Sequence, residues 1–234
     1  MGAISFSLNE RLVAFLVREL PLEVFVETGT FQGDSLQRAR KFFQECFSVE
    51  LSHELFTAAV AKFRDDPAAH LHQGESPAFL LAHRQVYCAR PALFWLDAHW
   101  CVADHTAGTD SQSPLIRELQ AIGPLHPQSV VLIDDARLYL CPPPAPHRLA
   151  DWPDFHEVNQ ALSQLSSGHR LAVYDDVLLF YPGSIRAGLT EFMHKHGADW
   201  LHLANLAREF QRRREKRRRW TRFFARSKNR PPPT

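Results

Sequence analysis

The chain has 234 residues, of which 45% are hydrophobic and 23% charged. This balance allows a full hydrophobic core and excludes wholesale disorder. The chain has no apolar run of about 18 residues, as a transmembrane helix needs, and its first residues lack the pattern of a signal peptide. Its four cysteines are widely spaced, which favours neither a disulfide framework nor a structural zinc site. We therefore expect a cytoplasmic protein.

Charge is distributed unevenly along the chain. Residues 208–230 carry 12 Lys or Arg and 2 Asp or Glu, whereas the remainder carries 15 basic and 24 acidic residues. This contrast predicts a main domain over residues 1–205 and a basic C-terminal helix and tail over 206–234. Three interpretations of the tail stay open. It is an amphipathic helix that binds the anionic surface on the inner face of the membrane, or a segment that binds the phosphates of a nucleic acid. The third is a solvated segment that partly folds against the acidic body. No Asn/Asp-Pro-Pro-Tyr motif supports base methylation, so nucleic acid is the less favoured partner.

Short apolar runs alternate with longer amphipathic ones, which is typical of an α/β fold with a mostly parallel sheet. The predicted strands are residues 23–27, 46–50, 69–72, 92–96 and 129–133, followed by an antiparallel pair at 170–174 and 177–181. The predicted helices are residues 7–19, 34–44, 53–65, 76–87, 114–122 and 154–165, with Ser52 and Ser113 as N-caps of the third and fifth.

A glycine-containing motif, Glu27-Thr-Gly-Thr-Phe-Gln-Gly33, follows the first predicted strand. Glycines at such a turn allow a ligand close to the backbone, and the next helix N-terminus favours an anion. Glu50 ends the second predicted strand, close to the spacing of roughly 20 residues at which an acid binds ribose hydroxyls. The alternative is an ordinary strand–helix turn with a strand-terminal acid. Because the spacing G-x-x-x-G differs from the G-x-G-x-x-G of pyrophosphate sites, we favour S-adenosylmethionine over NAD(P).

Carboxylates follow the fourth and fifth predicted strands, where open α/β sheets place their ligands. Asp97 comes first, and Asp134 and Asp135 follow the next strand. Three neighbouring carboxylates need a compensating cation, and Mg²⁺ with oxygen ligands is the natural one. In the alternative, Asp134 and Asp135 cap a strand end and pair with Arg137, and Asp97 alone is functional. His99 is a candidate ligand, general base or supporting donor.

The segments VETGTFQGDS, SVELSHEL, FWLDAHW and VLIDDAR, in this order, resemble class I S-adenosylmethionine-dependent methyltransferases. More specifically, they are similar to bacterial metal-dependent O-methyltransferases related to macrocin O-methyltransferase and to cephalosporin hydroxylase-like proteins. The resemblance covers about residues 20–140 and the predicted hairpin at 170–181. It implies a Rossmann-like methyltransferase fold, a seven-stranded mostly parallel sheet in the order 3-2-1-4-5-7-6 with helices on both faces.

The resemblance also assigns roles to residues. It implies that Glu27, Gly29 and Gly33 line the methionine end of the cofactor, that Glu50 binds the ribose, and that residues 74–76 border the adenine. The full candidate cofactor-binding set is Glu27, Thr28, Gly29, Gly33, Asp34, Ser35, Glu50, Gly74, Glu75, Ser76 and Asp97. Asp97, Asp134 and Asp135 are the candidate metal ligands, and Asp97 or His99 is the candidate catalytic base.

The expected function is therefore Mg²⁺-assisted O-methylation of a small-molecule hydroxyl group, on a sugar or a secondary metabolite. One alternative keeps the cofactor but uses His99 as base without a metal. Another is a non-catalytic methyltransferase-like binding module that its basic tail recruits to an anionic membrane or nucleic acid. The Pro-rich loop 141–146 and Trp152 are candidates for a wall of the substrate site, and a partner subunit of a homo-oligomer is a further candidate.

Overall fold

The computed structural model describes residues 8–100 and 111–228, and for residues 215–228 it describes the backbone alone. The strands are β1 (Val24–Thr28), β2 (Glu45–Glu50), β3 (Ala69–Gln73), β4 (Ala92–Leu96), β5 (Val130–Ile133), β6 (His169–Tyr174) and β7 (Val177–Pro182). The α-helices are α1 (Glu10–Glu19), α2 (Asp34–Ala39), α3 (His53–Phe63), α4 (Ser76–Ala89), α5 (Leu115–Ile122), α6 (Arg137–Leu140), α7 (Phe155–Leu165), α8 (Arg186–His196) and α9 (Trp200–Lys228). Short 3-10 turns cover Leu149–Asp151 and Gly183–Ile185.

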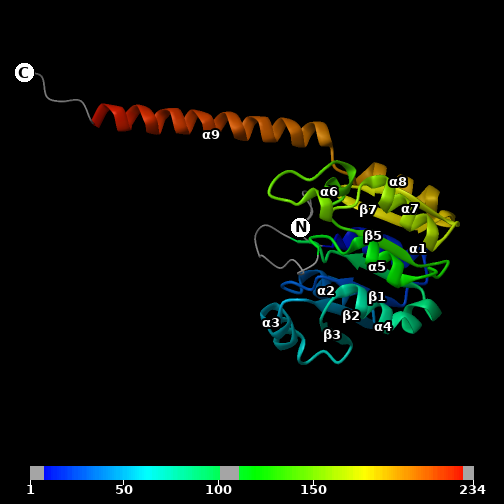
Figure 1. Ribbon diagram of the computed structural model, residues 1–234. Coiled ribbons are helices and arrows are strands. Elements are labelled where there is room, and N and C mark those ends of the chain that lie inside the picture. Colours follow the sequence, from blue (N-terminus) through cyan, green and yellow to red (C-terminus); the bar gives the residue numbers. More distant parts are fainter. Residues whose placement is uncertain (1–7, 101–110, 229–234) are drawn as a thin grey trace, which may run out of the picture. The chain divides into compact units, whose positions relative to one another are not determined.

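The strands form one seven-stranded sheet in the order β3-β2-β1-β4-β5-β7-β6 (Figure 1). Strands β1 to β5 run parallel, and β7 runs antiparallel to both β5 and β6. The predicted strand order is confirmed. Strand β1 pairs with β2 on one side and with β4 on the other. The strand order therefore changes direction at β1, which makes it the topological switch point of the sheet. In open α/β sheets, ligands bind outside the carboxyl ends of the strands at such a point.

Helices cover both faces of the sheet, so alternating side chains of each central strand feed two separate cores. Val24 and Val26 of β1 pack in the core covered by α4, α5 and α7, whereas Phe25 packs in the core covered by α1, α2 and α8. Burial on both faces explains why the central strands are almost continuously apolar. By the same alternation, Glu27 is directed to the α1 side of the sheet and Thr28 to the α4 side.

Some helix boundaries differ from the predicted ones. Ser52 caps α3 as predicted, since its hydroxyl accepts a hydrogen bond from Leu55 N at 3.4 Å. Ser113 does not cap α5, because Pro114 occupies the N-cap and the Ser113 hydroxyl lies 3.4 Å from the Tyr139 hydroxyl. Helix α2 ends at Ala39 rather than at residue 44, because the chain turns there and buries Phe43 before β2.

The chain divides into two compact units, the first ending at His196 and the second beginning at Gly197. Helix α8, which the sequence analysis did not predict, completes the first unit. The second unit contains α9, so this helix begins before the predicted boundary at residue 206. Among the described residues, no helix is both long and apolar enough to cross a membrane.

Candidate active site

The loop after β1 is held close to the end of β4 by its glycines. Gly29 has φ +82°, and a Cβ at this position would lie 2.4 Å from the carbonyl oxygen of Asp97. Gly33 has φ +72°, and its Cβ would lie 2.7 Å from the Phe63 ring of α3. Only glycine combines these backbone angles with such close approach. The predicted motif therefore forms the tight turn that joins β1 to α2, and this turn is in close contact with the end of β4 and with α3.

Glu27 is a fully buried carboxyl group beside this turn. Ser48 of β2 donates a hydrogen bond to its Oε2 at 2.6 Å, and the Ser48 hydroxyl also lies 2.6 Å from the Thr30 hydroxyl. In the described part of the chain, Glu27 Oε1 has no hydrogen-bond partner. Burial raises the pKa of Glu27 to about 8, and nearby Asp97 and Glu50 act in the same direction. A buried, half-satisfied carboxyl group is costly unless a ligand supplies a donor or a positive charge.

Glu50, at the end of β2, connects the surrounding loops. Its Oε2 accepts a hydrogen bond from Phe31 N and its Oε1 accepts one from Ser52 N, both at 2.8 Å. Its backbone carbonyl accepts a third from Gly74 N at 3.0 Å. Glu50 therefore positions the loops that follow β1, β2 and β3. Apart from Gly74 and its chain neighbours, no heavy atom of the described residues lies within 4 Å of the position that a Cβ on Gly74 would take, so the backbone there faces open space.

The remaining predicted cofactor residues lie in different environments. Thr28 and Ser76 are buried, whereas Glu75 is exposed at the N-cap of α4. Asp34 is exposed at the start of α2 and forms an ion pair with Lys62 of α3 at 2.9 Å. Ser35 is half-buried in the first turn of α2. The structure thus brings the motif together at the ends of β1 and β2, with Asp34 directed to α3.

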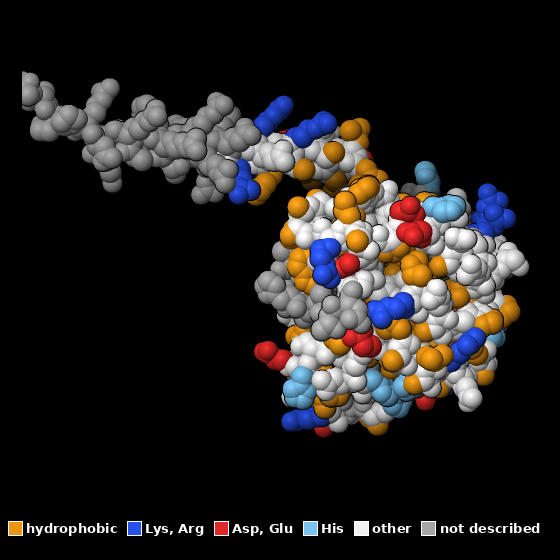
Figure 2. Space-filling view, in the orientation of Figure 1, with side chains coloured by type: hydrophobic (Ala, Val, Ile, Leu, Met, Phe, Trp, Pro, Cys, Tyr) orange, Lys and Arg blue, Asp and Glu red, His pale blue; other side chains and the backbone are white. Residues whose placement is uncertain are grey.

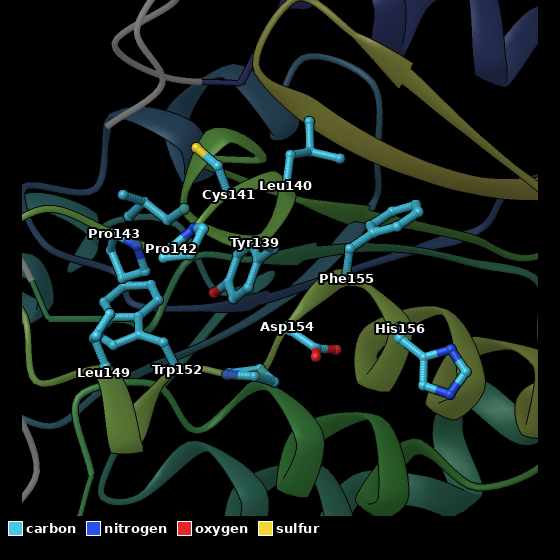
Figure 3. Close-up of a pocket in the computed structure, with 12 residues that line it drawn as sticks. Tyr139, Leu140, Cys141, Pro142, Pro143, Leu149, Trp152, Asp154, Phe155 and His156 are labelled. Atoms are coloured by element: carbon cyan, nitrogen blue, oxygen red, sulfur yellow. The ribbon is translucent and has the colours of Figure 1, made fainter.

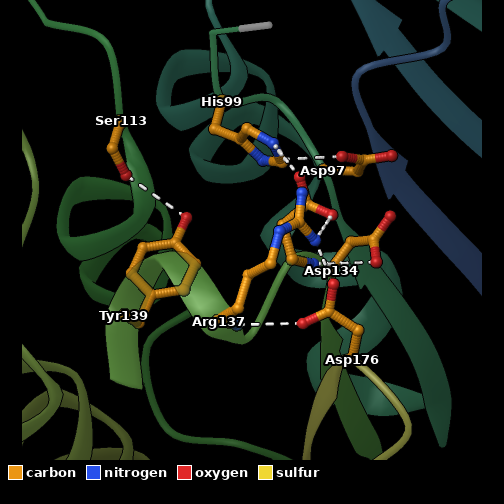
Figure 4. Close-up of polar contacts among 8 residues, drawn as sticks. Asp97, His99, Ser113, Asp134, Arg137, Tyr139 and Asp176 are labelled. Atoms are coloured by element: carbon orange, nitrogen blue, oxygen red, sulfur yellow. Dashed lines mark hydrogen bonds and ion pairs between the residues drawn. The ribbon is translucent and has the colours of Figure 1, made fainter. Parts of the chain in front are cut away.

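The ends of β4 and β5 carry the second part of the site (Figure 4). His99 lies between two carboxylates: its Nε2 is 3.0 Å from Asp135 Oδ2, and its Nδ1 is 3.5 Å from Asp97 Oδ1. Burial disfavours a charged imidazole, but the hydrogen bond to Asp135 and the charge of Asp97 prevail and raise the pKa of His99. The same hydrogen bond lowers the pKa of Asp135 to about 2 against the opposing effect of burial. The three side chains act as one coupled group.

Arg137 completes this network from the first turn of α6. Its guanidinium donates to Asp135 Oδ1 at 2.7 Å and also to Asp176, which lies in the turn between β6 and β7. Asp176 in turn accepts a hydrogen bond from Arg137 N at 3.0 Å. The sequence analysis gave, as its alternative to a metal site, that Asp134 and Asp135 pair with Arg137. The structure shows this ion pair for Asp135. The neighbouring Asp134 differs, since burial and its carboxylate neighbours raise its pKa well above the usual range.

This arrangement does not fit a divalent metal. Both carboxylate oxygens of Asp135 already bind cationic or donor groups, His99 on one side and Arg137 on the other. Asp134 Oδ1 accepts a hydrogen bond from Asp135 N at 2.8 Å. Among the described residues, no group of three His, Cys, Asp or Glu is arranged to hold a metal ion. His99 and Arg137 therefore occupy the oxygens of Asp135 that the sequence analysis assigned to Mg²⁺.

Two acidic residues near the site were missed by the sequence analysis. Asp176 is one of them, and it reaches the site only through the β6–β7 hairpin. Glu118 of α5 is the other: burial is the main cause that raises its pKa, and Ser76 lowers it by less. In the described structure its Oε1 has no hydrogen-bond partner. The available signal was its position on the apolar face of α5, where Leu115, Leu119 and Ile122 are also buried.

No family model matches the chain, and no curated protein matches it in sequence. Its structure is similar to that of a Staphylococcus aureus protein provisionally named a caffeoyl-CoA O-methyltransferase, with a TM-score of 0.52 and 16% identity over 74% of this chain and 82% of that one. It is also similar to the CMeT domain of the citrinin polyketide synthase, with a TM-score of 0.50 and 14% identity over 74% of this chain and 50% of that one. At such identities the likeness establishes the architecture. The chain has the Rossmann-like methyltransferase fold.

Proposed function

We propose that this chain binds S-adenosylmethionine at the carboxyl ends of β1, β2 and β4 and transfers its methyl group to a hydroxyl group of a small molecule. Glu27 is the observation that carries the proposal. Its carboxyl group is buried, its Oε1 has no partner in the described structure, and its pKa is about 8. A ligand that brings both a positive charge and N–H donors relieves this cost. S-adenosylmethionine has a cationic sulfur and an ammonium group.

The loops around Glu27 also suit a nucleoside. Glu50 fixes the turn at Phe31, and the backbone at Gly74 faces open space. Carboxylate oxygens have more than one lone pair, so Glu50 can bind these amides and still accept hydrogen bonds from ribose hydroxyls. Ser76 begins α4 beside the open backbone at Gly74, where the adenine is expected.

His99 is the proposed base. When bound, S-adenosylmethionine would supply a methyl group bonded to a positively charged sulfur. The acceptor oxygen would bond to the methyl carbon as the carbon–sulfur bond breaks, with S-adenosylhomocysteine as the leaving group. Asp135 holds the imidazole through Nε2, while the longer distance from Nδ1 to Asp97 leaves Nδ1 as the nitrogen that accepts the proton. The carboxylates of Asp97 and Asp135 then stabilise the imidazolium. No step in this scheme uses a metal, because the oxygens of Asp135 are engaged by His99 and Arg137.

The proposal is tested by replacing Glu27 with Gln and titrating S-adenosylmethionine calorimetrically. Removing the negative charge should weaken binding at least about tenfold, since hydrogen bonds to charged groups contribute about 1.5–3 kcal/mol. Glu23→Gln, at the residue just before β1, is the matched control because this side chain is 53% exposed and pairs with Arg90. Equal affinity of wild type and Glu27→Gln would contradict the assigned role of Glu27.

A second candidate function, recruitment to an anionic membrane surface, is favoured by α9. The first turns of this helix expose large apolar side chains: Trp200, Leu201, Leu203, Leu206 and Phe210. Figure 2 shows hydrophobic and Arg side chains together on the described part of the helix. The residues from 208 onward carry the excess of Lys and Arg noted above. A helix with apolar residues and many cations lies in the interface of an anionic bilayer, so we propose this surface as the partner of α9.

A further inference from the structure

A cavity of about 460 Å³ lies beyond β5, outside the residues assigned to the cofactor. It is enclosed by α6, the Pro-rich loop after it, the 3-10 turn Leu149–Asp151 and the beginning of α7 (Figure 3). Its volume falls within the range of roughly 300–1,000 Å³ in which small-molecule sites lie. The sequence analysis anticipated a wall formed by the Pro-rich loop and Trp152, and both line this cavity.

The lining is mostly apolar and aromatic. Tyr139 and Trp152 form its buried part, with ring centroids 5.7 Å apart. The polar atoms of both rings are engaged elsewhere, since Trp152 Nε1 donates to Gln112 Oε1 at 3.1 Å and the Tyr139 hydroxyl lies 3.4 Å from that of Ser113. The two side chains therefore offer ring surface rather than hydrogen-bonding groups to an occupant.

Three of the large apolar side chains that line the cavity are exposed. Leu140, Leu149 and Phe155 line it and are 46%, 61% and 38% exposed. Exposed apolar groups gathered at a concave site are typical of ligand binding. Leu149 belongs to a segment that is fixed in place, because Gln112 Oε1 accepts a hydrogen bond from Arg148 N at 2.7 Å. This hydrogen bond holds the beginning of the turn that carries Leu149 beside the cavity.

Charged groups are scarce in the lining, which narrows the chemistry of the occupant. Among the described residues no Lys or Arg lines the cavity, so these residues offer no permanent cation to a phosphate. Asp154 and His156 are the acidic and the basic side chain among the described lining residues, and Asp154 Oδ1 accepts a hydrogen bond from Glu157 N at 2.9 Å. The rest of the lining is Leu, Pro, Cys and aromatic side chains, so most hydroxyls of a sugar ring would lack partners there. The lining suits a flat, uncharged, apolar ring.

The cavity meets the proposed base at a shared wall. Trp152 lines the cavity, and its ring centroid lies 5.6 Å from that of His99. We propose that this cavity binds the aromatic part of an uncharged, phenol-like acceptor of the reaction at His99. The inference rests on the proposed function for the methyl transfer, but the cavity itself is defined by its own lining. It replaces the expectation of a sugar acceptor with that of an apolar aromatic one.

The test is direct binding of 2-naphthol to the full chain, with methyl glucoside and 1-naphthyl phosphate as probes of the rejected classes. We expect 2-naphthol to bind, and the other two to bind at least tenfold more weakly. Leu149→Asp should weaken 2-naphthol binding at least tenfold by placing a charge at the mouth. The matched control is Leu81→Asp on α4, since Leu81 is 60% exposed and does not line the cavity.

Two results would overturn the inference: no binding of 2-naphthol, or equal binding by wild type and Leu149→Asp. S-adenosylhomocysteine is titrated into the same proteins to separate this inference from the proposed function. If S-adenosylhomocysteine binds and 2-naphthol does not, the aromatic subsite is wrong and the proposed cofactor stands. If 2-naphthol binds in a Leu149-dependent way and S-adenosylhomocysteine does not, the cavity is supported and the methyltransferase proposal is wrong.

Discussion

His99 Nε2 lies 3.0 Å from Asp135 Oδ2, and both side chains are only 5% exposed. The opposite oxygen of Asp135 binds Arg137 at 2.7 Å, so one carboxylate links the proposed base to a fixed cation. Asp135 is thus a positioning residue for His99, because it fixes the orientation of the ring and stabilises its charged form.

Replacing His99 with Gln should abolish most methyl transfer without preventing cofactor binding. Glutamine can still bind Asp135 but cannot take up a proton, and loss of a general base lowers kcat by about 10²–10⁴-fold. The measurement is release of S-adenosylhomocysteine with a panel of hydroxyl acceptors, together with the Kd of the cofactor. His194→Gln on α8 is the control, since this side chain is exposed. Turnover by His99→Gln at the wild-type rate would show that His99 is not the base.

Gly29→Ala should destabilise the protein and disrupt the cofactor site. A side chain at φ +82° costs about 1–2 kcal/mol, and the added Cβ would also lie 2.4 Å from the Asp97 carbonyl oxygen. A loss of about 2 kcal/mol lowers Tm by roughly 4–8 °C in a chain of this size. The comparison is Gly168→Ala, where the nearest atom to the new Cβ is Ser166 Oγ at 3.8 Å. Similar melting curves for the two variants would contradict the close contact at Gly29.

Much of this site follows from local sequence patterns. Short apolar strands place Asp97 and Asp135 at the same edge of a parallel sheet, and the glycines of the first turn need left-handed backbone angles. The alternation of strands and helices predicts a mostly parallel sheet, whereas the order of the seven strands, which is confirmed, came from the resemblance to class I methyltransferases.

The parts that were missed depend on contacts distant in sequence. Asp176 contacts Arg137 because β7 pairs with β5. No local sequence pattern indicates that the β6–β7 turn lies beside the carboxyl ends of the parallel strands. Glu118 lies on the buried face of a helix whose partner surface is unknown from sequence. Mg²⁺ was inferred from three acids, but once the chain folds Arg137 supplies a cation to one oxygen of Asp135, and His99 contacts the other.

The raised pKa of Glu27 predicts a distinctive pH dependence of stability. Its pKa rises from 4.5 to about 8 on folding, so the native state holds the proton more tightly than the unfolded chain. Its contribution to stability is fully present below pH 4.5 and decreases as pH rises through about 8. Thermal unfolding of the unliganded protein between pH 5 and 8.5 should therefore show a falling Tm. The decline should be smaller in Glu27→Gln and retained in Glu23→Gln, and parallel curves for all three would contradict the shift.

Helix α9 should control binding to anionic lipid vesicles. Replacing Arg212, Arg213 and Arg214 with Gln removes three exposed cations within the full chain. Each basic residue near an anionic surface contributes about 1 kcal/mol, so partitioning should fall by about two orders of magnitude or more. Co-sedimentation with phosphatidylserine-containing vesicles measures the effect, and neutral vesicles and the unchanged affinity for S-adenosylhomocysteine are the controls. Equal partitioning of variant and wild type would rule out a membrane role for these residues.

The central claim is the cofactor site, and calorimetric titration of S-adenosylhomocysteine into the purified chain tests it most directly. The titration is performed once with Mg²⁺ and once with EDTA. Because His99 and Arg137 occupy both oxygens of Asp135, we predict binding in the micromolar range with the same Kd in both buffers. Binding that requires Mg²⁺ would contradict the metal-free site, and absence of binding in both buffers would contradict the methyltransferase proposal itself.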